Sequence, residues 1–435
     1  MSYPLPPVVV VPSASSYPAG SNPWNGTSPT NGGAMSSGFL LYGWTPGTPV
    51  AAQDENAWKA MIASATKEAL LLASTRPVSS GAFSETAPAF QVFLQSSNLL
   101  VEADNVSGKA RWATPDNAQS FLSSGSVTNM PTGGLIATWG NRSAPCAYVL
   151  DDVFANQVAR LLVVSEGSFA TPAVDTAFPA SAHGGWLDLL GCTDGTSSSV
   201  NDVIVALDQQ TMRGGTPQAG GGTYYSAIAL GASDFRYLGN RGANVYAFSP
   251  THSFSISAAN VLVGSGGTLH AATWDGGAIP ASCTMFRPEW DVTNARWVVA
   301  IANLTSDATL ASSAKLYTST DCFTWVTLAT PKVNDYSGTL RTVAVSAIKS
   351  VRGVLFAVAY VPNITAAPSG ATTEVVVSTD GGLTWLRLGH VIAANVAIGS
   401  KPDSVKIDAT PSHVHFQIAD SAIGRHWMTL ALGTW

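Results

Sequence analysis

The feature that most constrains this chain is an internal repeat near its C-terminal end. One copy begins with Arg-Trp-Val-Val-Ala-Ile at 296–301 and continues with Lys-Leu-Tyr-Thr-Ser-Thr-Asp-Cys-Phe-Thr-Trp at 315–325. The other begins with Gly-Val-Leu-Phe-Ala-Val at 353–358 and continues with Glu-Val-Val-Val-Ser-Thr-Asp-Gly-Gly-Leu-Thr-Trp at 374–385. The offset is about sixty residues, and each copy predicts strand, loop, strand, tight turn and strand. Such a period is typical of propeller blades.

The chain upstream of the repeat also predicts strands. From about residue 89, short apolar segments such as 135–139, 203–207 and 224–230 alternate with Gly, Pro, Asn, Asp and Ser, and no helix separates one strand from the next. This pattern fits a sandwich, a jelly roll or a propeller. Because of the repeat we predict a mainly β fold, a β-propeller of six or seven blades spanning 130–435.

The tight turns of the two copies carry a recognisable motif. The second copy reads Ser378-x-Asp380-x-Gly382-x-x-Trp385. It resembles the Asp box, or BNR repeat, of sialidases, sortilin-type receptors and many phage virion proteins. The first copy, with Ser319, Asp321 and Trp325, is one residue shorter, and we align its Phe323 with a glycine of the motif. A degenerate third candidate contains His415, Asp420 and Trp427.

The residue types of the motif indicate a structural role. Asp380 is suited to accept hydrogen bonds from backbone N–H groups of its own turn, and Gly381 and Gly382 are suited to positive φ. Trp385 is expected to pack between blades. The turn therefore predicts a locked hairpin and no chemistry.

The N-terminal fifty residues differ in composition from the rest. Nine prolines interleave with Gly, Ser and Asn, which excludes a compact domain and favours extended backbone. A disordered tail is the alternative to an arm ordered on a partner surface. We favour an arm over 1–50 because burial of its aromatic side chains against a partner surface is favourable in free energy. These side chains are Tyr3, Tyr17, Trp24, Phe39 and Trp44.

One amphipathic helix is predicted within 51–76, followed by a connecting β-rich segment over 77–129. Asp54 is the expected N-cap of this helix, Pro49 precedes the helix and Pro77 follows it. Its apolar face is suited either to pack under the β-domain or to self-associate in a dimer or trimer; the face contains Trp58, Met61, Ile62, Ala65, Ala69 and Leu72.

The composition limits the classes of partner that we expect this chain to bind. Only 11% of residues are charged and the formal net charge is −6, so the basic stripe typical of nucleic-acid binding is missing. Few charges on a large body favour a homo-oligomer. No stretch reaches the ~20 apolar residues of a membrane span, and the N-terminus has no Sec-type signal pattern. The four scattered cysteines, Cys146, Cys192, Cys283 and Cys322, are expected to be buried thiols in a protein made in a reducing cytoplasm.

No catalytic, cofactor or metal site is predicted. A sialidase needs an arginine triad, a Tyr–Glu pair, an Asp acid/base and an Arg-Ile-Pro motif; here Phe286-Arg287-Pro288-Glu289 lacks the isoleucine, and nothing groups Arg213, Arg236, Arg241 and Arg287. Asp151, Asp152 and Asp188 are dispersed acids. His413 and His415 share one strand face, where a surface or interface role is favoured over metal binding. The glycines at 214–215 and 220–222 are expected to be loops, because no phosphate-binding motif follows.

The arm, the 43–56 stretch leading into the helix, and the low-charge β-body resemble phage tail-fibre and appendage proteins. This resemblance implies a virion protein that docks by its arm to other virion proteins and presents propeller loops to a host-surface glycan or envelope protein. Tyr224, Tyr225, Trp274 and Trp290 are the expected exposed contacts. A purely structural collar or capsid-decorating protein is the alternative, and a sialidase-like glycoside hydrolase is a second one.

Overall fold

The chain is described here from a computed structural model. The described residues are 75–82, 89–94, 99–104, 109–113, 123–126, 135–138, 146–150, 159–165, 168–169, 173–175, 179–193, 202–216, 223–334, 339–361, 372–392, 405–420 and 424–433. They belong to one compact unit, Ser74–Thr434. The predicted arm over 1–50 and the helix within 51–76 lie outside them, with Tyr3, Tyr17, Trp24, Phe39, Trp44, Trp58, Met61, Ile62, Ala65 and Leu72.

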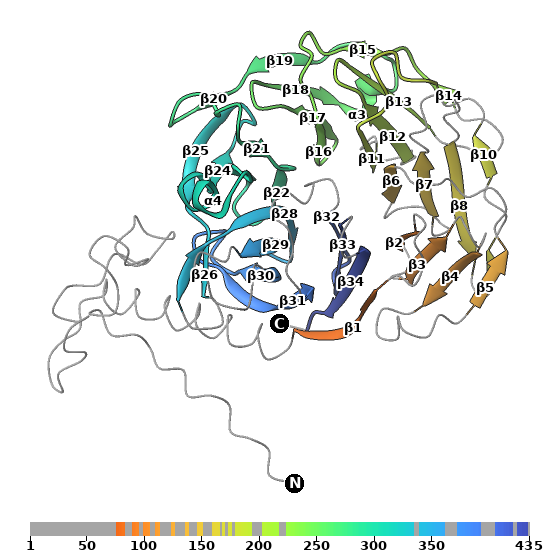
Figure 1. Cartoon of the computed structure of the whole chain (residues 1–435). Helices are drawn as coiled ribbons and strands as arrows, with labels where there is room; N and C mark the ends of the chain where they lie inside the picture. The colour runs from red at the N-terminus through yellow and green to blue at the C-terminus, as the bar shows by residue number, and fades with distance from the viewer. Residues whose placement is uncertain are drawn as a thin grey trace, which may run out of the picture. The chain divides into compact units, whose positions relative to one another are not determined.

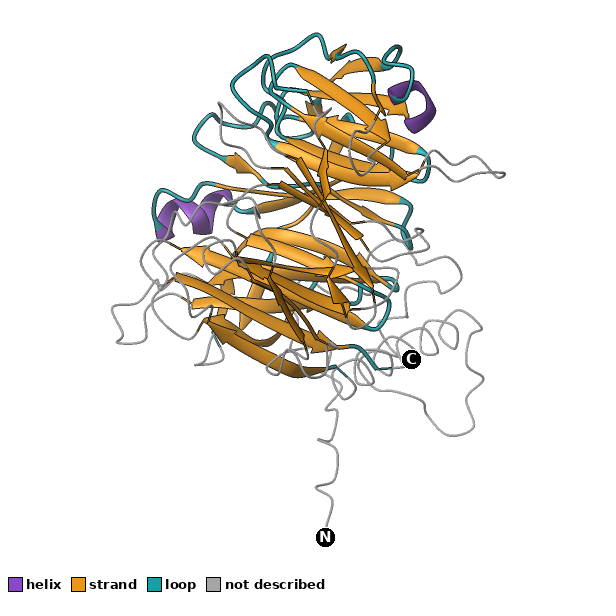
Figure 2. Cartoon of the chain, turned by 90° about the vertical axis from the view of Figure 1, so that its right-hand side faces the viewer, coloured by secondary structure: helices purple, strands orange, loops and turns teal. Residues whose placement is uncertain are grey.

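The described residues are mainly β-strands in antiparallel sheets (Figures 1 and 2). The first three sheets in chain order are formed by β2–β5, β6–β10 and β11–β15. Their strands are β2 (Ala89–Leu94), β3 (Leu99–Asp104), β4 (Lys109–Ala113), β5 (Ser123–Ser126), β6 (Leu135–Thr138), β7 (Cys146–Leu150), β8 (Ala159–Ser165), β9 (Ser168–Phe169), β10 (Ala173–Asp175), β11 (Asp188–Thr193), β12 (Asp202–Leu207), β13 (Thr211–Thr216), β14 (Thr223–Tyr224) and β15 (Ile228–Ala229).

The next three sheets are formed by β16–β19, β20–β25 and β28–β31, and β26 pairs with β27 in a small sheet of its own. Their strands are β16 (Tyr237–Arg241), β17 (Asn244–Phe248), β18 (His252–Ser257), β19 (Thr268–Ala271), β20 (Thr273–Trp274), β21 (Thr284–Met285), β22 (Glu289–Asp291), β23 (Arg296–Ala302), β24 (Lys315–Ser319), β25 (Thr324–Ala329), β26 (Lys332–Asn334), β27 (Leu340–Thr342), β28 (Ala344–Val351), β29 (Val354–Val361), β30 (Thr372–Ser378) and β31 (Leu386–Ile392).

The last sheet joins the two ends of the unit. It has the order β1-β34-β33-β32 and contains β1 (Arg76–Ala82), β32 (Val405–Ala409), β33 (His413–Asp420) and β34 (Gly424–Ala431). β1 runs antiparallel to β34, from the pair Arg76 and Ala431 to the pair Ala82 and His426. A strand from the start of the unit therefore completes the sheet made by its end.

Contacts between one strand of each sheet and one strand of the next arrange these sheets in a propeller-like ring (Figure 1). β2 contacts β6, β6 contacts β11, β11 contacts β16, β16 contacts β22, β22 contacts β28, and β28 contacts β32. β32 contacts β2, which returns the series to its start. The mainly β, propeller-like architecture expected from the repeat is confirmed.

The ring begins earlier in the chain than predicted. Residues 77–129, which we expected to connect the helix to a propeller starting at 130, contain the strands of one whole sheet, β2–β5, and nearly all of the outermost strand of the last one. The boundary was misplaced because strands outside the 296–388 repeat carry no repeated motif to mark them as blades.

The central strands are apolar on both sides because each sheet is covered by a neighbour on either face. β29, Val-Leu-Phe-Ala-Val-Ala-Tyr-Val, is buried at seven of its eight positions. One core cluster joins β23, β28, β29 and β30 and contains Val298, Leu316, Leu355, Val376 and Trp385. A second, between β11–β15 and β16–β19, contains Val205, Met212, Phe235 and Phe254.

Helix is confined to two short segments in the described residues, α3 (Ala258–Val261) and α4 (Asp307–Ser313). α4 starts with a capping box, in which Ser306 and Thr309 satisfy each other's backbone N–H groups. No helix in the described part of the chain is long and apolar enough to cross a membrane.

Candidate functional site

The Asp380 turn, between β30 and β31, is closed by its own side chains. The Asp380 carboxylate accepts hydrogen bonds from the N–H groups of Leu383 and Thr384, both at 3.0 Å, and from the Thr384 hydroxyl at 2.5 Å. The Ser378 hydroxyl donates to Asp380 at 2.7 Å and accepts from the N–H of Gly382 at 2.7 Å. Gly381 and Gly382 have φ of 76° and 103°, which L side chains rarely adopt.

The Asp321 turn, between β24 and β25, repeats this geometry with one residue fewer. Asp321 accepts from the N–H of Phe323 at 3.0 Å, the N–H of Thr324 at 2.7 Å and the Ser319 hydroxyl at 2.8 Å. Burial opposes the charge of Asp321, but the N–H groups of Thr324 and Phe323 outweigh it and hold its pKa below the usual value. The carboxylate stays ionised as a backbone acceptor.

The structure changes the alignment of the two turns. Phe323 and Leu383 donate equivalent N–H groups, so Phe323 does not stand in for a glycine. Cys322 does: its φ is 72°, against 76° at Gly381. Its thiol is buried and lies 3.6 Å from the Ser253 hydroxyl of the preceding sheet, and burial raises the thiol pKa to about 11. A thiol of this kind is protonated at neutral pH and unreactive.

The two tryptophans of the turns pack inside the fold. Trp385 is 4% exposed and donates from Nε1 to the carbonyl of Gly382 at 3.1 Å. Trp325 is 1% exposed and stacks on Trp274, with centroids 5.2 Å apart and planes inclined by 11°. It also meets the edge of Phe248 from β17 at 6.3 Å. Trp325 therefore joins its own sheet to the preceding one.

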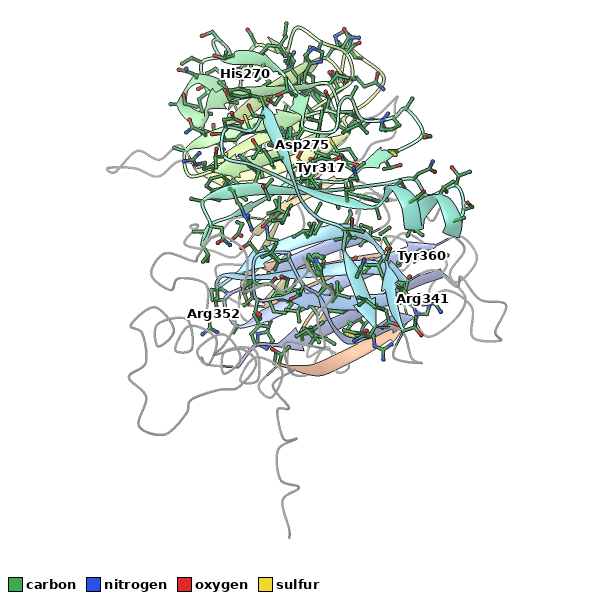
Figure 3. The ribbon with its side chains drawn as sticks, turned by 90° about the vertical axis from the view of Figure 1, so that its left-hand side faces the viewer. His270, Asp275, Tyr317, Arg341, Arg352 and Tyr360 are labelled. Atoms are coloured by element: carbon green, nitrogen blue, oxygen red, sulfur yellow. The ribbon has the colours of Figure 1, made fainter. Side chains whose placement is uncertain are left out.

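The Asp321 turn is attached to the outer strand of its own sheet and to the preceding sheet. The carbonyl of Phe323 accepts from the backbone N–H of Thr273 in β20 at 2.8 Å. The ring of Phe323 stacks on His270 of β19 in the preceding sheet, with centroids 4.5 Å apart and planes inclined by 10°; Figure 3 labels His270. The turn thus serves as a contact between sheets as well as a hairpin.

Three arginines link consecutive sheets in a repeated manner. Arg241 donates to the carbonyl of Thr320 at 3.4 Å, and Arg296 donates to that of Gly381 at 2.8 Å, so each Asp turn receives an arginine from the sheet before it. Arg352 donates to Gly433 at 2.9 Å and to Pro411 at 3.4 Å in the last sheet (Figure 3). We call these three residues the arginine latches. Their spacing of about 55 residues is one blade period.

The arginine latches recur in the sequence at a regular spacing that the motif of the Asp turns does not include. Each arginine lies at or beside the turn between the first two long strands of its sheet, in Asn-Arg-Gly, Asn-Ala-Arg and Val-Arg-Gly. They lie outside that motif because each arginine is more than fifty residues before the turn that it contacts.

A second group of charges connects the inner strands. Asp188 of β11 pairs with Arg287 and accepts from the N–H of Leu238 in β16 at 2.6 Å. Burial opposes the charge of Arg287, but Asp188 outweighs it and raises the pKa. In the next sheets, Glu289 of β22 accepts from Lys349 of β28 at 3.2 Å, and chiefly this carboxylate raises the pKa of Lys349. Ion pairs thus join β11 and β28 to the segment that contains Arg287 and Glu289.

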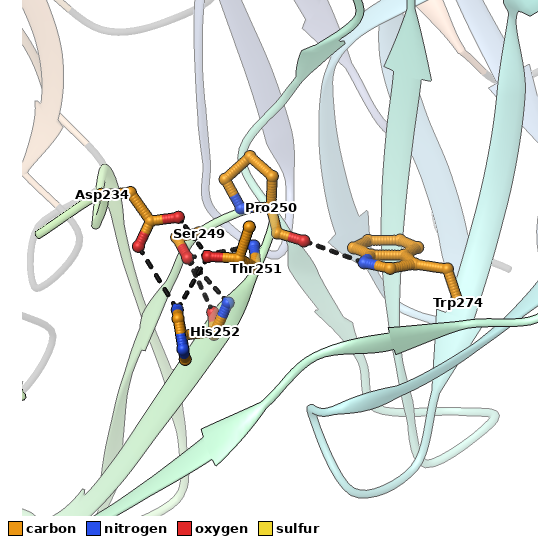
Figure 4. Close-up of polar contacts among 6 residues, drawn as sticks. All are labelled: Asp234, Ser249, Pro250, Thr251, His252 and Trp274. Atoms are coloured by element: carbon orange, nitrogen blue, oxygen red, sulfur yellow. Dashed lines mark hydrogen bonds and ion pairs between the residues drawn. The ribbon is translucent and has the colours of Figure 1, made fainter. Parts of the chain in front are cut away.

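A third polar group fixes the turn from β17 to β18 (Figure 4). The Ser249 hydroxyl accepts from the N–H groups of Thr251 at 3.2 Å and His252 at 2.8 Å. The Thr251 hydroxyl lies 2.7 Å from Nδ1 of His252 and donates to Asp234, whose other oxygen lies 3.5 Å from the same Nδ1. On the other side, Trp274 donates from Nε1 to the carbonyl of Pro250 at 2.9 Å. Contacts with Asp234 on one side and with Trp274 on the other therefore hold this turn in place.

Two predicted contacts are placed differently from expectation. Trp274 is 8% exposed and held between Trp325 and Tyr317, so the expectation that it is an exposed ligand contact is wrong. Trp290 is half-buried, and the guanidinium of Arg241 covers its ring at 4.3 Å. Tyr224 and Tyr225 are half-buried.

The two histidines of β33 do not lie on the surface. His413 and His415 are 6% and 1% exposed, so a surface role is excluded. His415 lies 2.8 Å from the Thr429 hydroxyl, and burial lowers its pKa to about 3. Among the cysteines with described side chains, Cys192 and Cys322 are buried thiols and Cys283 is a half-buried one.

The site chemistry within the described residues is limited. No three His, Cys, Asp or Glu side chains there are placed to hold a metal ion. Two arginines considered for a sialidase-like triad are occupied separately, Arg241 on Trp290 and Arg287 on Asp188. The carboxylates and guanidiniums of this arrangement fix turns and hold neighbouring sheets together.

Comparisons with known proteins add little. No family model and no curated protein matches the chain. Similar solved structures include the N-terminal domain of Nup159, with 11% identity over 83% of this chain and 96% of that one, at a TM-score of 0.42. Hsv2 of Kluyvelomyces marxianus has 11% identity over 78% and 96%, at 0.42, and the Dos1 propeller has 6% over 78% and 77%, at 0.41. Similarity at this level says nothing about what this chain binds.

Proposed function

We propose that this chain is a non-enzymatic component of a bacteriophage virion, a tail-fibre or appendage protein. Residues 1–50 dock it to other virion proteins as part of a homo-oligomer. Its ring is a seven-bladed propeller with Asp-box turns, and the loops of the ring are presented to a host-surface glycan or envelope protein. Residence in the virion follows from this role, after synthesis in the host cytoplasm.

The observation that carries the proposal is the use made of the charged groups. Asp321 and Asp380 bind the N–H groups of their own turns, the arginine latches bind main-chain carbonyls, and Asp188, Arg287, Glu289 and Lys349 pair across the inner strands. Most glycoside hydrolases use two carboxyl groups that are free to act on the same bond. These groups are engaged in holding sheets together, which suits a rigid platform for display.

The phage assignment is supported by the sequence resemblance of the arm, the 43–56 stretch and the Asp380 turn. A purely structural collar or capsid-decorating protein would use the same ring only for contacts between subunits. The two roles differ in one respect: an adhesin binds the host surface when separated from the particle.

The test compares the full chain with a variant lacking residues 1–50, after melting curves show that both are folded. We expect both proteins to bind host cells and only the full chain to join particles that lack the protein. Binding of neither protein to host cells, with malformed particles in its absence, would favour the structural role. Attachment of the truncated chain to particles would refute the docking arm, and sugar release from host polysaccharide would refute the non-enzymatic role.

A further inference from the structure

The strand that completes the last sheet has the features of a detachable element. β1 is the outermost strand of its sheet and pairs only with β34. Its sequence, Arg-Pro-Val-Ser-Ser-Gly-Ala, has at its second position a proline, which has no N–H to donate, and includes a glycine, which weakens a strand. The register with β34 shifts between Pro77 and Ser79, so Val78 has no partner in the ladder.

β34, in contrast, is firmly attached to the ring without β1. It pairs with β33 along its whole length, from Ala431 opposite His413 to Gly424 opposite Asp420. Trp427, Met428 and Leu430 are buried. Beyond the strand, Leu432 donates to the carbonyl of Ser412 at 2.7 Å and the carbonyl of Gly433 accepts from Arg352 of the preceding sheet. Separation is therefore easier between β1 and β34 than between β34 and β33.

The register also decides how a load acts on this contact. Arg76, the residue nearest the N-terminal arm, pairs with Ala431, and the ladder continues to Ala82 and His426. Tension on the chain before Thr75 acts on the Arg76–Ala431 pair first and reaches the others one after another. Local openings of the lowest free energy occur where chain ends fray, so the Arg76 end of the ladder is the place where β1 opens first.

We propose that β1 is a releasable closing strand: tension on the N-terminal segment peels it from β34 and leaves β34 as the edge of the last sheet. The source of the tension, an arm docked to a virion, rests on the proposed function. The peeling itself does not, because it depends only on residues 76–82 and 424–433.

The test stretches single molecules of the full chain in optical tweezers. One handle is attached to the N-terminus and the other to an azide-bearing residue substituted at Ala243, which lies in the exposed turn between β16 and β17. We expect an early reversible lengthening, before the main unfolding event, on the order of 40 Å for roughly a dozen released residues at the reach of an extended chain.

Two disulfide variants provide the matched comparison. Arg76→Cys with Ala431→Cys locks the end next to the arm and is expected to abolish the early step. Ala82→Cys with His426→Cys locks the far end and is expected to leave a step of about half that length. Mass spectrometry verifies each cross-link, and reduction is expected to restore the full step.

The proposal is overturned if the wild-type chain shows no early step, or if the step persists unchanged when Arg76 and Ala431 are cross-linked. Either result is independent of whether the protein binds particles or host cells. Failure of this mechanism is thereby distinguishable from failure of the proposed function.

Discussion

Acidification tests the packing of the last sheet through the buried imidazole of His415. His415 of β33 is 1% exposed, lies 2.8 Å from the Thr429 hydroxyl, and has its pKa lowered by burial to about 3 from the model-peptide value of 6.5. The unfolded chain binds a proton at this residue below pH 6.5, whereas the folded chain does so only near pH 3. Its contribution to stability is present above pH 6.5 and is lost as the pH falls toward 3.

The size of this effect follows from the shift. Each pH unit between the two pKa values costs about 1.4 kcal/mol of unfolding free energy, so lowering the pH from 6.5 to 5 removes about 2 kcal/mol. This range avoids the carboxylates whose pKa values are held low, Asp275 by the N–H and hydroxyl of Thr327 and Asp321 by its turn. Their contributions are lost only below the ordinary aspartate pKa.

The assay is denaturant unfolding at pH 7.5, 6.5, 5.5 and 5.0 for the wild type, His415→Gln and Thr429→Val. His415→Gln is less stable at neutral pH but loses the imidazole that titrates, so its stability changes less with pH. Thr429→Val removes the hydrogen-bonding hydroxyl and keeps the imidazole, so its pH dependence persists. If His415→Gln loses as much stability as the wild type between pH 6.5 and 5, the reasoning about this residue is wrong.

Three further pairs of substitutions test the locked turns, each by denaturant unfolding at pH 7. Cys322→Gly is expected to be about 1 kcal/mol more stable than Cys322→Ala, because both lose the thiol and only glycine relieves the positive φ; equal stability would contradict the strain. Asp380→Ala is expected to cost about 2 to 4 kcal/mol through its lost acceptors, and Asp380→Asn, which keeps one acceptor oxygen, clearly less; equal losses would mean that the turn does not depend on these bonds. Arg296→Ala leaves the buried Asp291 without its cation and is expected to cost about 2 to 3 kcal/mol, against under about 1 kcal/mol for the exposed Arg241→Ala; the reverse order would refute the account of the latches.

How far the sequence predicts the fold is visible in the two repeat copies. Their strands and turns could be found because Ser, Asp and Trp recur at fixed spacing and each has a local partner within a few residues. The sheet β2–β5 and the closing strand β1 could not be recognised in this way. The place of β1 depends on pairing with residues more than three hundred positions away, such as Arg76 with Ala431, and the place of β2–β5 in the ring depends on contacts of β2 with β6 and β32; no local pattern encodes either.

The candidate site shows the same division. The role of Asp380 followed from the chemistry of its own turn, while the burial of Trp274 and His415 depends on which sheet lies next to each. Cys322 is the clearest case: an aligned sequence suggests that Phe323 replaces a glycine, and only the backbone angles show that the substitution is one residue earlier. The exposure of a side chain and the φ of a shortened turn are properties of the packed structure.

The central claim is that successive sheets form a closed ring whose last member takes its outer strand, β1, from the beginning of the unit. An experimental structure of the full chain, by crystallography or electron microscopy, tests it most directly. Our account predicts seven radial sheets around one axis, with Arg76 opposite Ala431 and with Arg296 bound to the carbonyl of Gly381. A different order of sheets, or a last sheet without β1, would contradict it.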